Sequence, residues 1–183
     1  MINVLNTPRL FSLSLVLVTA VTTLTACQTS YVNEPVKDVD MISVSHVAAE
    51  KMISQSKGRL KPGNIVVASF ANIDDLEKSS TFGRIVAQQI ASVFSRKGYK
   101  IVEMLLRDTV YIGTNEGEFL LSRELSKIGD EHDAEAVIVG TYAVGSKKVY
   151  VTSKVVRAKD SVVLAAEDFV LPLGPDLRTL VKK

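Results

Sequence analysis

Residues 64–70 read NIVVASF, and residues 80–97 read STFGRIVAQQIASVFSRK. The first stretch is apolar on both faces and rich in β-branched residues, which predicts a buried central strand. The second predicts an amphipathic helix, because its apolar residues fall on one stripe: Phe82, Ile85, Val86, Ile90, Val93 and Phe94. Ser79 or Ser80 can cap the start of this helix. Residues 99–106 resume as a strand, so we expect a strand-helix-strand unit with a right-handed crossover.

Further elements flank this unit on both sides. Apolar residues at helical spacing predict a helix over 44–56 before it. After it, we expect a loop at 113–117, a second helix over 118–128 and a third buried strand over 136–142.

The last part of the chain predicts a β-hairpin. Strands over 148–157 and 161–171 are joined by the turn sequence AKDS at 158–161, and residues 176–183 form at most a short helix. On the first strand we expect Val149, Val151, Ser153 and Val155 on the buried face, and Tyr150, Thr152 and Lys154 on the other. The fold class is therefore α/β: a mixed sheet in a layered βαβαβ arrangement, then an antiparallel hairpin, with an extra N-terminal helix.

Composition excludes several classes of protein. The chain of 183 residues has 22 Lys and Arg against 20 Asp and Glu, which argues against a sequence-independent nucleic-acid binder. A hydrophobic fraction of 46% excludes wholesale disorder. The single cysteine excludes an internal disulfide framework and a Cys/His zinc site.

The N-terminal segment is typical of a secretory signal. One cation, Arg9, precedes an apolar run over 10–18, and a small-residue run ends in the tetrapeptide LTAC at 24–27. This tetrapeptide resembles the lipobox of bacterial lipoproteins, which implies cleavage between Ala26 and Cys27 and a covalent lipid on Cys27. Two alternatives are an uncleaved transmembrane anchor and a secreted protein with a chance cysteine; the apolar run is shorter than the ~20 residues of a spanning helix. Because Gln28 stands where an inner-membrane retention signal would place Asp, the resemblance implies the outer membrane.

These assignments divide the chain into three parts. Residues 1–26 form the signal peptide, residues 27–43 a lipidated tether and residues 44–183 a single α/β domain. A tether of roughly 16 residues reaches at most about 55 Å. We therefore expect the domain to remain near the membrane leaflet that holds its lipid.

Few residues are candidates for catalysis or metal binding. The chain has two histidines, His46 and His132, and we interpret both as surface residues, the second at a solvated helix end within DEHD at 130–133. The acidic stretch IDDLE at 73–77 resembles a carboxylate pair, but acidic residues before a helix also favour the turn and the helix dipole.

No recognisable cofactor motif accompanies these residues. The sequence contains neither G-x-G-x-x-G nor G-x-x-x-x-G-K-[ST], the common phosphate-binding patterns. Four tyrosines are too far apart in sequence for an aromatic platform and are assigned to packing: Tyr99, Tyr111, Tyr142 and Tyr150. We predict no catalytic, metal or cofactor residues, and a protein that acts through its surfaces rather than as an enzyme.

Several stretches together resemble the FlgO family of flagellar outer-membrane lipoproteins. They are IVVASFAN at 65–72, FGRIVAQQI at 82–90, KGYKIVE at 97–103, AEAVIVGTY at 134–142 and the closing hairpin with VVR at 155–157. The resemblance covers about residues 44–171 and includes no catalytic motif. Its broader fold is similar to the N-terminal domain of TolB, to the LpoB activator of peptidoglycan synthases and to the periplasmic part of CsgG.

The resemblance implies a structural protein at the base of the flagellum, needed for its assembly or stability and for motility. Its partners would be the outer membrane, flagellar basal-body or other outer-membrane flagellar proteins, and further copies of itself in a ring or other homo-oligomer. A regulatory module that activates a peptidoglycan synthase is an alternative, although about 16 tether residues reach too little to cross the peptidoglycan. A secretion pore similar to CsgG is a further alternative, but charged residues along the hairpin disfavour lipid-facing strands.

Overall fold

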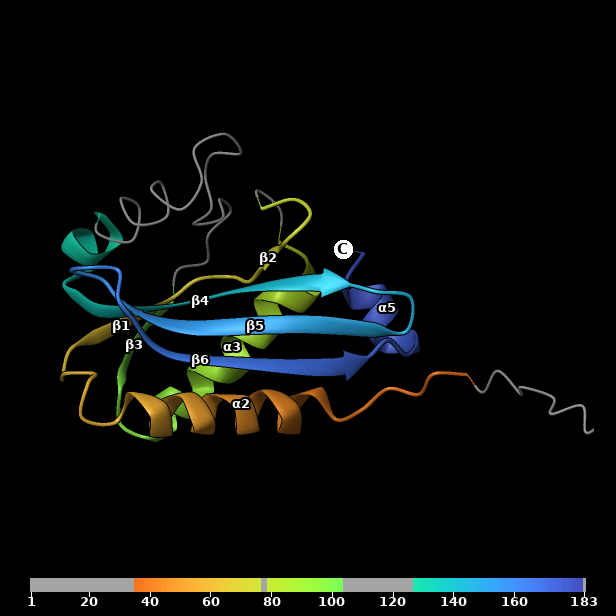
Figure 1. Cartoon of the computed structure of the whole chain (residues 1–183), viewed down its shortest axis with the longest axis horizontal. Coiled ribbons are helices and arrows are strands. Elements are labelled where there is room, and N and C mark those ends of the chain that lie inside the picture. Colours follow the sequence, from red (N-terminus) through yellow and green to blue (C-terminus); the bar gives the residue numbers. More distant parts are fainter. Residues whose placement is uncertain (1–34, 77–78, 104–126, 183) are drawn as a thin grey trace, which may run out of the picture. The chain divides into compact units, whose positions relative to one another are not determined.

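A six-stranded mixed sheet is the centre of the compact unit formed by residues 35–183 (Figure 1). The computed structural model describes residues 35–76, 79–103 and 127–182. The strands lie in the order β3-β1-β4-β5-β6, and the short β2 pairs with β4. The elements are α2 (Met41–Ser56), β1 (Asn64–Val67), β2 (Ala71–Asn72), α3 (Thr81–Arg96), β3 (Lys100–Glu103), β4 (Ala134–Val144), β5 (Lys148–Arg157), β6 (Val163–Pro172) and α5 (Pro175–Leu180).

The strand-helix-strand unit and the hairpin confirm the predicted fold class. β1 runs parallel to β3 on one side and to β4 on the other, whereas β4, β5 and β6 are antiparallel to one another. The strand predicted over 64–70 ends early, because the chain leaves β1 after Val67 and then pairs again as β2, opposite Thr141 and Tyr142. The apolar run continues through both strands, so the sequence pattern did not show this break.

Different helices pack on the two faces of the sheet. Ile65 and Val67 of β1 belong to the large core with α2 and α3, whereas Val66 and Ala68 belong to a second cluster that includes Ile128. Alternate residues of a strand point to opposite faces, so α3 and the helical segment 127–132 pack on opposite faces. This arrangement is the one expected of right-handed crossovers, because β3 and β4 lie on opposite sides of β1.

The ends of the helices follow from capping chemistry. Ser80 caps α3, since its Oγ accepts a hydrogen bond from the N–H of Gly83 at 3.3 Å. Ser80 is one of the two residues that the sequence offered as the cap. α2 begins at Met41 rather than at the predicted residue 44. The reason is Asp40, whose carboxylate accepts from the first free N–H groups of the helix. Apolar spacing alone did not show this cap, and Met41 and Val44 of the first turn are half-buried against the large core.

The hairpin has the predicted faces. Val149, Val151, Ser153 and Val155 are buried against α2 and α3, while Tyr150 and Lys154 are exposed. The predicted loop at 113–117 and Tyr111 lie outside the described residues, as do the end of the predicted strand 99–106 and most of the predicted helix 118–128. Lys127 and Ile128 lie in a helical segment that continues to His132. Across the described ranges, no helix is long and apolar enough to cross a bilayer.

Candidate interaction surfaces

The residues considered for catalysis lie in separate places. His132 ends the helical segment before β4, and its carbonyl accepts from Asn64 Nδ2 at 3.0 Å. The ring of His46 on α2 lies 3.4 Å from Nη2 of Arg96 on α3. Within residues 35–76, 79–103 and 127–182, no three His, Cys, Asp or Glu side chains come together as a metal site. Cys27 and Ala26 lie outside the described residues, so lipidation and cleavage stay predictions.

Asp74 and Asp75 take part in the turn after β2. The N–H of Asp74 donates to Asn72 Oδ1 at 3.0 Å, and the N–H of Asp75 donates to the Asn72 carbonyl at 3.1 Å. This is the local side-chain turn that Asn favours. The backbone of these two residues therefore forms the turn that the sequence predicts, whereas the role of their carboxylates stays a prediction and Glu77 lies beyond the described ranges.

Tyr142 and Ser80 connect the end of β4 to the start of α3. The Tyr142 hydroxyl donates to Ser80 Oγ at 2.8 Å, and the Tyr142 ring contacts Phe82 edge-on, with centroids 5.1 Å apart. Both residues are buried. Tyr142 thus packs in the core, as predicted, and holds the capping serine in place.

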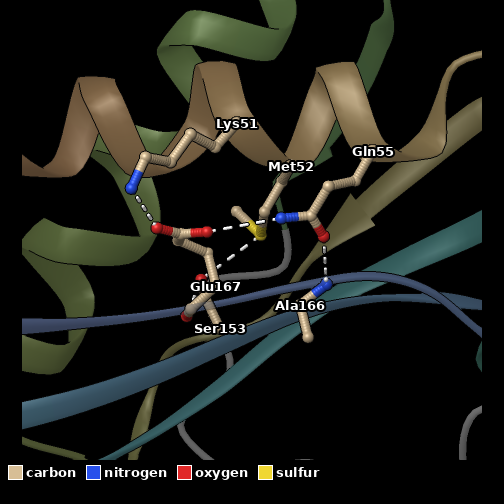
Figure 2. A network of polar contacts seen from close by, with 6 residues as sticks. All are labelled: Lys51, Met52, Gln55, Ser153, Ala166 and Glu167. Carbon is tan, nitrogen blue, oxygen red and sulfur yellow. Dashed lines mark hydrogen bonds and ion pairs between the residues drawn. The ribbon is translucent and has the colours of Figure 1, made fainter.

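The outer edge of β6 is covered by α2. Gln55 Oε1 accepts from the N–H of Ala166 at 3.0 Å, and Gln55 Nε2 donates to Glu167 at 3.3 Å. Lys51 Nζ reaches the same carboxylate at 2.6 Å. Figure 2 shows Gln55 between the edge strand and the Glu167 side chain. Below them, Ser153 Oγ lies 3.2 Å from Met52 Sδ and 3.1 Å from the Glu167 carbonyl.

This network occupies part of the β6 edge that a partner strand could otherwise use. An exposed edge strand offers unpaired N–H and C=O groups to other chains, and proteins block such edges with charges or covering elements. Here a side-chain amide occupies the N–H of Ala166, and the Lys51–Glu167 ion pair lies beside it. Partner binding by strand addition at this position is therefore blocked.

The outer face of the hairpin carries exposed side chains and has no covering element among the residues that the structure describes. Tyr150 of β5 pairs with Val170 of β6, and their side chains are 53% and 43% exposed. Val163 near the other end of β6 is 45% exposed on the same sheet. Thr152 and Asp168 lie between these apolar positions, joined by a 2.6 Å hydrogen bond. This face combines apolar and polar side chains, as protein interfaces do.

Asp38 fixes the chain segment before α2 to the C-terminal helix α5. Its carboxylate accepts from the N–H of Asp176 at 2.9 Å and from the N–H of Leu177 at 3.2 Å. Gly174 provides the room for this contact, because a Cβ there would meet the Asp38 side chain and backbone. No local pattern in the sequence indicated this cap, since the partners are 138 and 139 positions apart.

Asp40 caps α2 in the same way, but locally. Ser43 Oγ donates to its Oδ2 at 2.5 Å, and the N–H groups of Ile42 and Ser43 donate to its Oδ1 at 3.1 and 3.2 Å. These hydrogen bonds hold the pKa of Asp40 below its ordinary value, and the one from the Ser43 hydroxyl contributes most.

Comparison with known proteins identifies both a family and a fold. The family model described as FlgO protein matches residues 46–176. No curated protein matches the sequence. The structure is similar to the LpoB C-terminal domain from Salmonella enterica, with a TM-score of 0.53 and 11% identity, over 72% of this chain and 98% of that one.

The same fold recurs in other solved structures. The LpoB C-terminal domain from Escherichia coli gives a TM-score of 0.52 at 11% identity, again over 72% and 98% of the two chains. An NMR structure of E. coli LpoB gives 0.50 at 10% identity, over 79% of this chain and 73% of that one. The predicted relation to the LpoB fold is confirmed, and the relations to TolB and CsgG stay predictions.

Proposed function

The chain belongs to the FlgO family, and from this premise we propose that it is a lipid-anchored outer-membrane protein of the flagellar base. In this role it supports assembly or stability of the flagellum and thereby motility. The family match over residues 46–176 is the observation that carries the proposal, because it spans nearly the whole of the unit that begins at residue 35.

The length of the tether supports a position close to the membrane. Lipidation at Cys27, after cleavage behind Ala26, would place the anchor eleven residue steps before Asp38. Asp38 is held on α5, so the chain that can extend freely is shorter than the 16 residues estimated from the sequence. Eleven steps span at most about 40 Å. The domain, on the periplasmic side, therefore lies within this distance of the leaflet.

The proposed role is non-enzymatic and needs no cofactor beyond the covalent lipid. The polar groups near the start of α3 are engaged in structure, since Ser80 caps the helix and Tyr142 holds Ser80. The open hairpin face with Tyr150 and Val170 is the candidate contact for flagellar partners or for further copies. Repetition of a small domain around the flagellum would produce a ring.

The first experiment is a deletion strain complemented with wild type or with Cys27→Ser. We expect loss of swimming and missing density beneath the outer membrane in cryotomograms, both restored by wild type alone. Radiolabelled palmitate should label wild type and not Cys27→Ser, and immunoblots should show that both proteins accumulate. Normal swimming with an unchanged flagellar base in the deletion strain would reject the flagellar role.

The fold also suggests a second candidate function: an activator, similar to LpoB, of a peptidoglycan synthase. The likeness covers 98% of the LpoB C-terminal domain, but at 11% identity it supports the fold alone. The short tether disfavours this role, because such an activator must reach through the peptidoglycan to an inner-membrane enzyme. Incorporation of labelled cell-wall precursor in the deletion strain separates the two: reduced incorporation with normal swimming would favour the activator.

A further inference from the structure

Three separate parts of the chain meet where the tether joins the domain. Residues 35–40, the connection between β4 and β5, and α5 lie at one end of the sheet (Figure 1). Asp38 holds α5, Arg178 Nη2 donates to the Ser146 carbonyl at 3.3 Å, and the N–H of Leu173 donates to the Lys147 carbonyl at 2.8 Å. We call this surface, formed by residues 35–42, 144–148 and 173–182, the tether end.

The tether end exposes apolar side chains among basic ones. Its exposed apolar residues are Val39 (43% exposed), Ile42 (53%) and Val144 (39%). Its basic residues are all exposed: Lys37, Lys147, Lys148, Arg178 and Lys182. They outnumber the acidic residues there: Asp38, Asp40 and Asp176.

Two of the three acidic charges at the tether end are offset by the protein itself. Asp38 accepts from the N–H groups at the start of α5, and Asp40 accepts from those at the start of α2. Free N–H groups at a helix start carry partial positive charge, which stabilises a carboxylate. The exposed side chains of Lys37, Lys148, Arg178 and Lys182 therefore dominate the electrostatic potential that a partner would meet.

We propose that the tether end is a membrane-docking surface that binds anionic phospholipid headgroups. Apolar side chains surrounded by lysine and arginine are typical of proteins that lie on an anionic bilayer. This inference rests on the proposed anchor at Cys27, because a lipid attached eleven residues before Asp38 tethers the domain to the leaflet at this end. Docking gives the domain one orientation on the membrane and leaves the open hairpin face to proteins.

The opposite end of the unit supplies a matched control. Lys57 follows α2, Lys100 begins β3 and Lys159 lies in the β5–β6 turn, and all three are exposed. The sixteen residues of α2 and the ten of β5 separate this end from the tether end. Removing three charges here changes the net charge by the same amount without touching the proposed surface.

Vesicle binding tests the proposal directly. Residues 35–183 form a compact unit with its own core, so a chain beginning at residue 28 can be purified without the lipid. We expect it to sediment with vesicles of phosphatidylcholine and phosphatidylglycerol in equal amounts, and not with phosphatidylcholine alone. The variant Lys37→Gln/Lys148→Gln/Lys182→Gln should bind roughly 100-fold more weakly, since each basic residue near an anionic surface contributes about fivefold.

The control variant Lys57→Gln/Lys100→Gln/Lys159→Gln should bind like wild type. Thermal melts should show that both triple variants fold. Equal weakening in the two variants would show attraction by net charge without a docking face, and absence of binding by wild type would reject the proposal outright. Palmitate labelling of the full chain is measured separately, so failure of docking and failure of anchoring give different results.

A second readout reports the orientation on the vesicle. The chain from residue 28 contains no cysteine, so Val144→Cys at the tether end and Lys159→Cys at the opposite end each take one environment-sensitive dye. With anionic vesicles, the emission of the dye at position 144 should shift to the blue and that at position 159 should not. A shift at position 159 alone would overturn the proposed orientation.

Discussion

Two aspartates two positions apart determine how the chain enters the domain. Asp40 starts α2, next to it in sequence, whereas Asp38 reaches α5 at the other end of the chain. Both use a carboxylate to accept from helix N–H groups that would otherwise need water. The segment before α2 is therefore part of the domain's structure.

Replacing Asp38 by Ala should loosen this segment. We expect a loss of about 1 kcal/mol in the free energy of unfolding, the usual size of a lost helix cap, measured by urea denaturation. Hydrogen exchange at the amides of Asp176 and Leu177 should accelerate more than exchange in β5. Asp38→Asn retains an acceptor oxygen and should lie between wild type and Ala. Unchanged exchange at both amides in the Ala variant would contradict the assigned cap.

Because the pKa of Asp40 is lowered in the folded protein, the stability of the domain should depend on pH. Its folded pKa lies below its ordinary value of 3.8, so its contribution is complete above that value. The contribution is lost as the pH falls through the lowered folded pKa. Asp40→Asn removes this titration while keeping a residue that caps well. Melting temperatures measured from neutral pH to below 3.8 should therefore fall less in the Asn variant; parallel curves would refute this assignment.

Gly83 allows α3 to approach the segment between β1 and β2. It is buried in the first turn of the helix, and a Cβ there would overlap the Phe70 carbonyl. Gly83→Ala should therefore destabilise the domain by about 1–3 kcal/mol, although alanine is the better helix former. The control is Ser95→Ala on the exposed side of the same helix, which should be close to neutral. A stabilised Gly83→Ala variant in urea denaturation would show that the backbones can separate.

At the scale of elements, α2 protects the sheet edge as well as covering the core. Gln55→Ala removes the acceptor for the N–H of Ala166 and leaves part of β6 open to pairing. We expect concentration-dependent association, measured by light scattering, with a small loss of stability because the contact is exposed. Ser54→Ala, a neighbouring exposed position on α2, is the control and should associate no more than wild type. Equal association of the two variants would indicate that Gln55 does not guard the edge.

The elements also show what the sequence could and could not predict. The apolar residues within β1, within α3 and within the hairpin recur at the spacing of a strand or a helix, and the positions of these elements were predicted from that spacing. The break between β1 and β2, the contact of Asp38 with α5 and the Gln55 network depend on residues distant in sequence. The periodicity of apolar residues predicts one helix or strand at a time. These contacts and the tether end could therefore be recognised only in the folded structure.

At the scale of the whole molecule, the distance between anchor and domain should matter for function. Inserting a second copy of residues 28–34 after Glu34 lengthens the reach by about 25 Å and leaves Asp38 in place. If the domain acts close to its leaflet, this variant should swim poorly although it is lipidated and abundant. Swimming halos and palmitate labelling measure the two properties. Normal swimming would show that the distance is not constrained.

The contact between Asp38 and α5 has a practical consequence for labelling the protein in cells. The chain enters the domain beside its C-terminal helix, so under the proposed anchoring and docking a fluorescent fusion joined after α5 would occupy the space between the domain and the bilayer. The turn at 158–161 lies at the far end of the ten-residue strand β5, about 33 Å away. A reporter inserted in that turn would stand clear of the proposed docking surface, and imaging in living cells should begin with such an insertion.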